Sequence, residues 1–208
     1  MDLILSLSER GNNLCEYIFR KGGSGVSTRT VPVFLATDIM TVRTVIKFPN
    51  PNLKKISEPV TVFDEDLKQL VQDMFETMYE DKGIGLAAPQ IDVHKQIVVI
   101  DTSEDKSEQR VIINPRFILE EGETGIEEGC LSVPLDYRAY VKRFEHVIVE
   151  CQNEKGETYQ IDAHDLLAIC IQHELDHLKG VLFIDYLSSL KRNLLLSKIK
   201  KEERRNRK

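Results

Sequence analysis

The chain has 208 residues, of which 41% are hydrophobic and 30% are charged, with a formal net charge of −6 at pH 7. This composition is ordinary for a globular protein, and the length suits one domain with a sizeable core. No apolar run approaches membrane-spanning length, which excludes a membrane protein, and the first residues lack the basic start of a secretory signal. Four cysteines, at positions 15, 130, 151 and 170, show neither paired metal spacing nor a dense disulfide framework, which favours a cytoplasmic location.

Residues 1–39 contain no motif, and we interpret them as a leader of unknown role that is flexible or non-native. They include the flexible sequence Gly22-Gly23-Ser24-Gly25. Met40 is an alternative start of the protein. A transit peptide is disfavoured because the segment carries the acidic residues Asp2, Glu9, Glu16 and Asp38.

Residues 67–79 carry apolar side chains at intervals of three and four residues, which predicts an amphipathic helix. The sequence Gly83-x-Gly85-x-x-Ala88 follows it and satisfies the loose dinucleotide-binding fingerprint. That fingerprint requires a strand before it and a helix after it. Here a helix precedes it, and Pro89 and a strand follow it. Nicotinamide binding is therefore rejected.

The central part of the chain alternates between short apolar segments and turn residues. These segments predict strands near 96–101, 111–114, 116–121, 146–152 and 157–162. The residues Asn153-Glu154-Lys155-Gly156 predict a turn between the last two strands.

Residues 172–178 read Gln-His-Glu-Leu-Asp-His-Leu and form the one metal-site pattern in the chain. On a helix, the spacing of His173 and His177 places both imidazoles on one face, where a metal ion fits between them. Glu174 then lies beside the metal, where it can deprotonate a bound water. The alternative is a helix with two solvated histidines. The almost unbroken apolar run 166–171 argues against that alternative because it predicts a buried helix.

Strands and two helices in this order predict an α+β fold, with mostly antiparallel sheets packed around a central metal-binding helix. Asp162 or His164-Asp165 is expected to cap the start of this helix, and Gly180 to end it.

The third metal ligand is absent from the usual downstream positions. The pattern His-Glu-x-x-His is typical of metalloproteases, and one large group places a third histidine six residues further on. Phe183 stands at that position here. A second group uses a glutamate about twenty residues downstream, but Glu202 and Glu203 lie in a basic tail with no sign of burial.

Two cysteines remain as candidate ligands. Cys170 lies one turn before His173, so its short thiol would have to reach past that histidine, and we interpret it as part of a pocket wall. Cys130 follows Gly129 in a strand end or loop and is the better candidate. A thiolate with two imidazoles leaves one coordination position open for water, as catalysis requires.

Three motifs in a fixed order resemble the peptide deformylase family. They are Gly83-Ile84-Gly85-Leu86-Ala87-Ala88-Pro89-Gln90, then Glu128-Gly129-Cys130-Leu131-Ser132, then Gln172-His173-Glu174-Leu175-Asp176-His177. The resemblance extends from about Met40 to about Lys200. It implies the same α+β architecture. It also implies a metal-dependent hydrolase that removes the N-terminal formyl group from formylmethionyl peptides of nascent proteins and releases formate.

The resemblance also implies the roles of individual residues. The catalytic residues would be Glu174 as the base, with the Gln90 side-chain amide and the Leu131 backbone N–H as oxyanion donors. The wall and edge along which an extended peptide lies would be Ile84, Gly85 and Leu86. The pocket for the methionine side chain would be surrounded by Ile126, Cys170 and His173, with Gly129 also at the substrate site. The metal ligands would be Cys130, His173 and His177.

The resemblance implies one divalent ion per chain, with ferrous iron as the physiological metal and zinc, nickel or cobalt able to replace it. The ligand set alone also suits zinc. The implied partners are formylated nascent peptides in the bacterial cytoplasm, with no membrane, and a monomer is favoured. Two alternatives are a zinc endopeptidase of the His-Glu-x-x-His type and a catalytically silent metal-binding module. The second would be signalled by a broken Glu174 or Gln90, and both are intact.

Residues 191–208 form a basic tail with nine Lys and Arg residues against two Glu, a net charge of +7 that leaves −13 on the rest of the chain. Leu190, Leu194 and Leu195 continue a helical pattern into it, which predicts a C-terminal helix. The tail is either a solvated, fraying helix end or a docking arm for a polyanion, of which the ribosome is the relevant one for this function.

Overall fold

A computed structural model describes residues 14–21, 25–32 and 41–206, and its contacts divide the chain into two units, 1–39 and 40–208. In the first unit, strand β1 (Leu14–Lys21) pairs antiparallel with β2 (Gly25–Pro32). The sequence analysis predicted neither strand. Residues 22–24 of the predicted flexible stretch, and Met40, lie outside the described residues.

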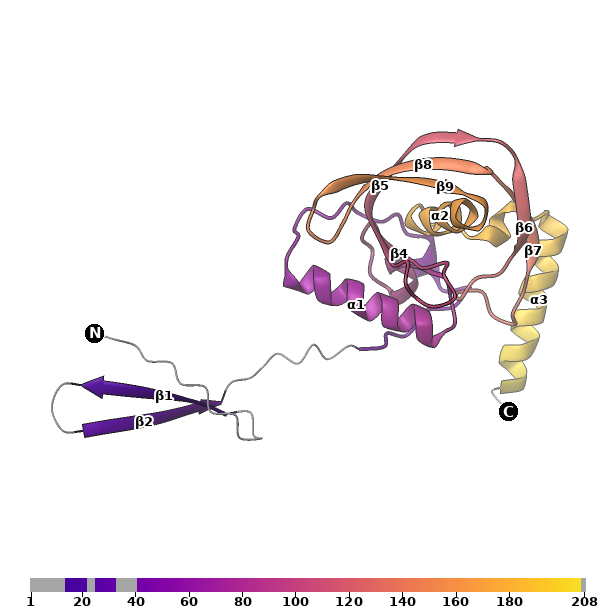
Figure 1. Ribbon diagram of the computed structural model, residues 1–208. Helices are drawn as coiled ribbons and strands as arrows, with labels where there is room; N and C mark the ends of the chain where they lie inside the picture. Colours follow the sequence, from indigo (N-terminus) through magenta and orange to yellow (C-terminus); the bar gives the residue numbers. More distant parts are fainter. Residues whose placement is uncertain (1–13, 22–24, 33–40, 207–208) are drawn as a thin grey trace. The chain divides into compact units, whose positions relative to one another are not determined.

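The second unit is built on a five-stranded antiparallel sheet with the order β3-β4-β5-β8-β9 (Figure 1). Its strands are β3 (Gly85–Ala87), β4 (Ile97–Ile100), β5 (Arg110–Glu121), β8 (His146–Gln152) and β9 (Thr158–His164). The predicted strands correspond to β4, β5, β8 and β9, whereas the short strand β3 inside the glycine motif was missed.

Two of the predicted strands, 111–114 and 116–121, form a single strand in the structure. β5 runs continuously through both predicted segments, with a register irregularity against β8 between Ile113 and Arg116. Asn114 there has a φ of 50°, and Pro115 follows it without an N–H to donate. The sequence break therefore marks a bulge within one strand, not a turn between two.

The predicted metal-binding helix is α2 (Asp165–Leu178), and it packs against one face of the sheet, which curves over it (Figure 1). The buried contact joins Ala168, Ile171 and Leu175 of α2 to apolar side chains of the strands, among them Val98, Val147, Val149, Ile161 and Ala163. His164 is the N-cap residue, but its side chain makes no capping hydrogen bond. Gly180 follows the helix end with a φ of 71°, as a helix stop requires.

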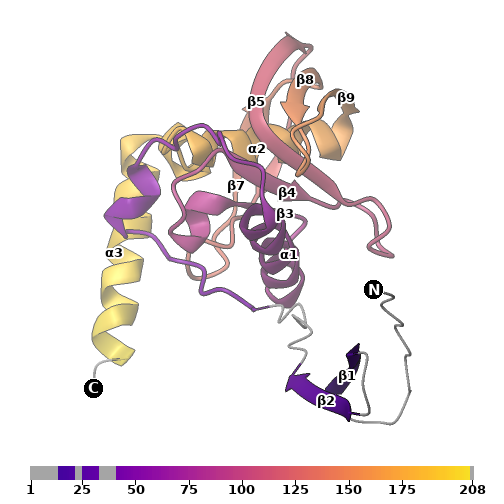
Figure 2. The ribbon, with the colours of Figure 1, turned by 90° about the vertical axis from the view of Figure 1, so that its left-hand side faces the viewer.

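Helix α1 (Glu65–Glu80) contains the predicted amphipathic helix, and β3 and β4 lie between it and α2 (Figure 2). Its first turn is capped by the Asp64 carboxylate, which accepts a hydrogen bond from the Leu67 N–H at 3.0 Å. The apolar stripe of α1 packs on Leu86, Ile97, Val99 and Ile113. Both faces of β3 and β4 are thus covered, which holds the glycine motif in the core.

A further cluster of buried apolar side chains, which includes Leu53, Val141 and Phe183, lies beside a two-stranded sheet. This sheet pairs β6 (Thr124–Glu128) with β7 (Ala139–Arg143), and neither strand was predicted. Short 3-10 helices η1 (Pro51–Lys54), η2 (Ala88–Ile91) and η3 (Phe183–Tyr186) connect the elements. The C-terminal helix α3 (Ser189–Asn206) buries Leu195 and Ile199 against this cluster. The tail is therefore a helix packed along one face.

The predicted α+β class, the mostly antiparallel sheets, the central helix and the C-terminal helix are all confirmed. No helix among the described residues is both long enough and apolar enough to cross a membrane.

Candidate metal centre and active site

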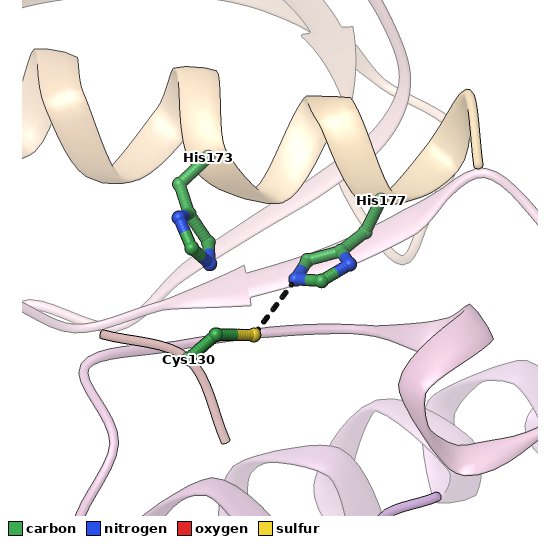
Figure 3. A group of neighbouring side chains, drawn as sticks. All are labelled: Cys130, His173 and His177. Carbon is green, nitrogen blue, oxygen red and sulfur yellow. Dashed lines mark hydrogen bonds between the residues drawn. The ribbon is translucent and has the colours of Figure 1, made fainter. Parts of the chain in front are cut away.

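The structure brings together the three side chains that the sequence analysis assigned as metal ligands (Figure 3). His173 and His177 project from successive turns of α2, and Cys130 faces them from the loop after β6. Their ligand atoms lie within 4.8 Å of one another, and the Cys130 sulfur is 3.3 Å from Nε2 of His177. A thiolate and two imidazoles that converge in this way fit a divalent transition-metal ion with one open position.

A buried carboxylate orients one of the two imidazoles. Nδ1 of His173 lies 2.7 Å from Oε2 of Glu128, so the other ring nitrogen is left to face Cys130. Burial opposes ionisation of Glu128, yet its hydrogen bonds with His173 and Arg143 hold its pKa below the usual range. The carboxylate therefore stays charged where it can stabilise a metal-bound imidazole.

Arg143 ties this carboxylate to α2. Its Nε lies 2.7 Å from Glu128, and its terminal nitrogen lies 2.7 Å from Oδ2 of Asp176. Asp176 also accepts a hydrogen bond from the Tyr186 hydroxyl at 2.9 Å. Since Arg143 and Glu128 are only 5% and 3% exposed, they form a buried ion-pair cluster with Asp176 next to the candidate ligand His173. The sequence analysis missed Arg143, Asp176 and Tyr186 as contributors.

Glu174 lies beside the cluster of candidate ligands Cys130, His173 and His177, and its carboxyl group is unusual because it is buried without a charged partner that neutralises it within the described part of the chain. Its Oε2 is buried and has no hydrogen-bond partner among the described residues. Burial raises the pKa of Glu174 to about 7, against a smaller opposing effect of His173. A carboxyl group with this pKa can accept and return a proton near neutral pH.

Gln90 is held so that its amide nitrogen faces the ligand cluster. Its Oε1 accepts a hydrogen bond from the Ala87 N–H at 2.7 Å. Its Nε2 donates to the Ser132 hydroxyl at 3.2 Å and lies 3.6 Å from the Cys130 sulfur. The backbone bond fixes which end of the amide points at the site, so a donor is available where an oxyanion would form.

A cavity of about 480 Å³ opens onto this cluster. Nearly all the predicted site residues line it: Ile84, Gly85, Gln90, Ile126, Gly129, Cys130, Leu131, Cys170, His173 and Glu174. The side chains of Ile84 and Ile126 are exposed there, among charged side chains such as those of Lys82, Glu127 and Arg138. His177 is buried and does not line the cavity.

The side chain of Leu86, which was expected at the wall and edge of the substrate site, is turned away from the cavity. This side chain is fully buried in the core against α1, and it does not line the cavity. Successive residues of a strand point to opposite faces, so Leu86 must point away from the side that Gly85 presents to Glu174. Only its backbone can contribute to a substrate edge.

Leu166 and Ile169 also line the cavity, and the sequence analysis missed them. Together with Cys170 and His173 they fall at helical positions i, i+3, i+4 and i+7. This spacing was visible in the sequence and would have placed both residues on the face that carries the first ligand.

Three converging metal-ligand side chains beside a buried, unpaired carboxylate define a metal-dependent hydrolase site. The profile of the family described as Polypeptide deformylase matches residues 42–193 of the chain. A peptide deformylase of Tolumonas auensis is 52% identical over 163 residues, covering 78% of this chain and 97% of that protein. One of Neisseria gonorrhoeae is 52% identical over 165 residues, covering 79% and 98%.

Comparison with solved structures leads to the same family. A crystal structure of a peptide deformylase from Legionella pneumophila is 45% identical, has a TM-score of 0.76 and covers 81% of this chain and 99% of that one. A structure of peptide deformylase from Ehrlichia chaffeensis in complex with actinonin is 39% identical with a TM-score of 0.75, covering 79% and 99%. The chain therefore belongs to the peptide deformylase family. This membership supports the deformylase interpretation and gives no support to the alternative, a zinc endopeptidase.

Proposed function

We propose that Cys130, His173 and His177 hold the divalent metal ion with which this enzyme removes the formyl group from nascent peptides. The chain is a metal-dependent peptide deformylase, which hydrolyses the formamide bond of N-terminal formylmethionine and releases formate. The observation that carries the assignment of ligands is the convergence of one sulfur and two ring nitrogens within 4.8 Å, next to Glu174.

A metal ion in this site, when bound, supplies a Lewis acid that polarises the formyl oxygen and lowers the pKa of water. Glu174 takes a proton from the attacking water and delivers it to the leaving amine, so that water and formamide become formate and a free N-terminus. The Gln90 amide and the Leu131 N–H donate hydrogen bonds to the developing oxyanion.

The cavity positions the peptide. Ile126, Cys170 and the adjoining Leu166 and Ile169 form an apolar pocket that suits the unbranched thioether of methionine. β3 is an edge strand of the sheet, and Ile84 and Gly85 lie at the cavity, so an extended peptide can lie along this edge. A peptide held in this way presents its formyl group to Glu174.

The direct test is formate release from formyl-Met-Ala-Ser by anaerobically purified protein, with metal analysis of the same sample. We expect formate in proportion to bound metal and no cleavage of internal peptide bonds. Cleavage of an unformylated peptide at an internal bond would contradict the proposal.

Ferrous iron is the metal that we propose for the cell, with zinc, nickel or cobalt able to occupy the same ligands. The resemblance to the family implies this choice, and a thiolate ligand beside a redox-active ion is vulnerable to oxidation. Activity of the iron-loaded protein should then decay in air, whereas the nickel-loaded protein should keep its activity. Indifference of the iron-loaded protein to air would contradict this choice.

We also propose that residues 40–190 form the catalytic domain of a monomeric, cytoplasmic bacterial enzyme and that residues 1–39 are a dispensable leader. The division of the chain into units 1–39 and 40–208 supports this, as does the start of the family match at residue 42. Deletion of residues 1–39 should leave peptide deformylation unchanged, and a large loss of activity would show that the leader belongs to the enzyme.

The basic tail, finally, is proposed to dock on the ribosome. Lys200, Lys201, Arg204 and Arg205 gather along α3, whereas Leu195 and Ile199 bind the helix to the body. Truncation would remove those buried anchors, so charge substitution is the cleaner test. Replacement of the four basic residues by Gln should abolish cosedimentation with bacterial ribosomes at low salt, while short-peptide activity persists. Undiminished cosedimentation would leave the tail without this role.

A further inference from the structure

Two histidines outside the active site face each other at one end of the five-stranded sheet. His146 begins β8 and His164 ends β9, and the two are direct partners in the register of the antiparallel pair. On its other side, His146 is the partner of Glu121, the last residue of β5. Asp162 lies two residues before His164 and therefore on the same face of β9. Three neighbouring strands thus bring four metal-ligating or charged side chains onto one face.

The contacts among these side chains are short. Nδ1 of His146 lies 2.7 Å from Oε1 of Glu121, and its Nε2 lies 2.7 Å from Oδ1 of Asp162. Nε2 of His164 lies 3.3 Å from the same Asp162 oxygen. The two imidazole rings stack with 4.0 Å between their centroids and 9° between their planes. His146 is 16% exposed, whereas His164 and Asp162 are 59% and 65% exposed.

We propose that His146, Asp162 and His164 form a second metal site, which takes Zn²⁺ or a divalent ion of similar ligand preference. Their ligand atoms lie within 4.8 Å of one another. Two imidazoles and a carboxylate form a ligand set that zinc, nickel and copper prefer, unlike the oxygen-only sets of magnesium and calcium.

Glu121 supplies a feature expected of a metal-bound histidine. Metal-ligating histidines usually donate their second ring N–H to a carboxylate, which fixes the tautomer and aims the other nitrogen at the ion. Glu121 occupies that place on Nδ1 of His146 and leaves Nε2 directed at Asp162 and the proposed ion. Glu121 is thus a positioning residue of the site.

The spacing is close to what an ion needs. In tetrahedral zinc coordination with bonds of about 2.0–2.2 Å, neighbouring ligand atoms stand roughly 3.4 Å apart. The Asp162 and His164 atoms already do so at 3.3 Å, whereas the His146 and Asp162 atoms lie 2.7 Å apart and must separate when an ion enters. Binding requires the stacked rings to tilt so that both Nε2 lone pairs point at one ion, and the exposed ring of His164 has room to rotate. The remaining coordination positions open to water.

The negative charges around the two histidines favour a bound cation at this site. The site lies at the start of α2, whose N-terminus disfavours a nearby cation. Asp162 and Glu121 supply two negative charges against it. The competing explanation is a protonated His146 held between these carboxylates, whose hydrogen bonds raise the His146 pKa above the usual range. Metal and proton would compete for the same nitrogen.

Metal stoichiometry separates the two explanations. The full chain, dialysed against Zn²⁺ at a pH above the histidine range and passed over a desalting column, is analysed for total bound metal per chain. We expect His164→Ala to lose one equivalent relative to the unaltered protein while its deformylase activity is unchanged. His94→Ala is the matched control, because His94 is the remaining histidine outside both sites, and it should lose none.

Substitution of the other two proposed ligands tests the assignment of the second metal site. His146→Ala and Asp162→Asn should each lose the same equivalent, with thermal melting used to confirm folding. Addition of Ni²⁺ should broaden amide resonances around His146 and His164 in the unaltered protein and not in His164→Ala. Equal metal content in the unaltered protein and His164→Ala would overturn the proposal and leave a proton-stabilised ion-pair cluster. Loss of metal from His94→Ala would likewise place the second ion elsewhere.

Discussion

Gly85 lies directly against Glu174. A methyl carbon at Gly85 would stand 2.5 Å from Oε1 of Glu174 and 2.9 Å from the Cys170 sulfur, distances that atoms in contact do not tolerate. The glycine therefore creates the space in which the proposed base sits. It explains in steric terms why the motif Gly83–Gln90 has no side chain at this position.

Gly85→Ala should consequently displace Glu174 and lower kcat strongly, while the three metal ligands remain in place. Metal content and kcat for formate release are measured on the same sample. Gly83→Ala provides a comparison, because a methyl carbon there meets the flexible end of the Leu131 side chain at 2.9 Å, which can shift. A greater loss in Gly83→Ala than in Gly85→Ala would contradict the steric argument.

Glu174→Gln should keep the metal and lose turnover. The substitution preserves shape but removes the base, and losses of general-base catalysis typically amount to about a hundredfold to ten-thousandfold. Glu127→Gln is a control, because this carboxylate also borders the cavity but is exposed. Near-normal turnover in Glu174→Gln, with a normal metal content, would remove Glu174 from the proposed role.

The raised pKa of Glu174 predicts a pH dependence of stability in the metal-free protein. Its pKa is about 7 when folded and 4.5 when unfolded, so the folded state holds the proton more tightly. The protein should lose stability as the pH rises between these values, by on the order of 3 kcal/mol, with no further loss from this group above about pH 7. Thermal melting of the metal-free proteins across this range should show that the unaltered protein loses more stability than Glu174→Gln does. Metal should suppress the dependence, because a nearby cation favours the carboxylate.

Much of this site was readable from the sequence because its chemistry is local. The four-residue spacing of His173 and His177 fixes their common helix face without knowledge of the fold. The assignment of Cys130 as the third ligand required the elimination of other candidates, because Cys130 lies in a loop that is distant in sequence from the two histidines. The stacked pair His146 and His164 could not be read from the predicted turn, because symmetric pairing about residues 153–156 would place His146 opposite Ala163, whereas the structure pairs it with His164.

The parts that escaped prediction depend on contacts between distant elements. Arg143 lies on β7, whose strand was not recognised, and its partners come from β6 and α2. The direction of the Leu86 side chain, which is buried in the core, also escaped prediction because β3 was not recognised as a strand. Side-chain direction became clear only when Gly83–Gln90 was seen to contain a strand.

Cys130 and Cys170 should respond differently to substitution by serine. Cys130→Ser replaces the proposed sulfur ligand and should lower both metal content and activity. Cys170 lines the cavity but is not among the converging ligand atoms, and burial raises the pKa of its thiol, so we expect it to act as a pocket wall. Cys170→Ser should therefore change KM more than metal content. An equal loss of metal from both variants would show that the ligand assignment is wrong.

The buried ion-pair cluster next to His173 leads to the last prediction. Arg143→Ala leaves Glu128 and Asp176 charged and buried without their shared partner, which should destabilise the protein by about 3–5 kcal/mol. Loss of the fixed Glu128 should also loosen His173, and outer carboxylate partners typically contribute about tenfold to a hundredfold in metal affinity. Arg116→Ala is the matched control, because Arg116 pairs with Glu150 at 2.7 Å but is 68% exposed, so its loss should cost about 0–1 kcal/mol. Chemical denaturation and metal titration of both variants measure the two effects. If Arg143→Ala matches Arg116→Ala in stability and binds metal normally, the cluster neither stabilises the fold nor orients the ligand.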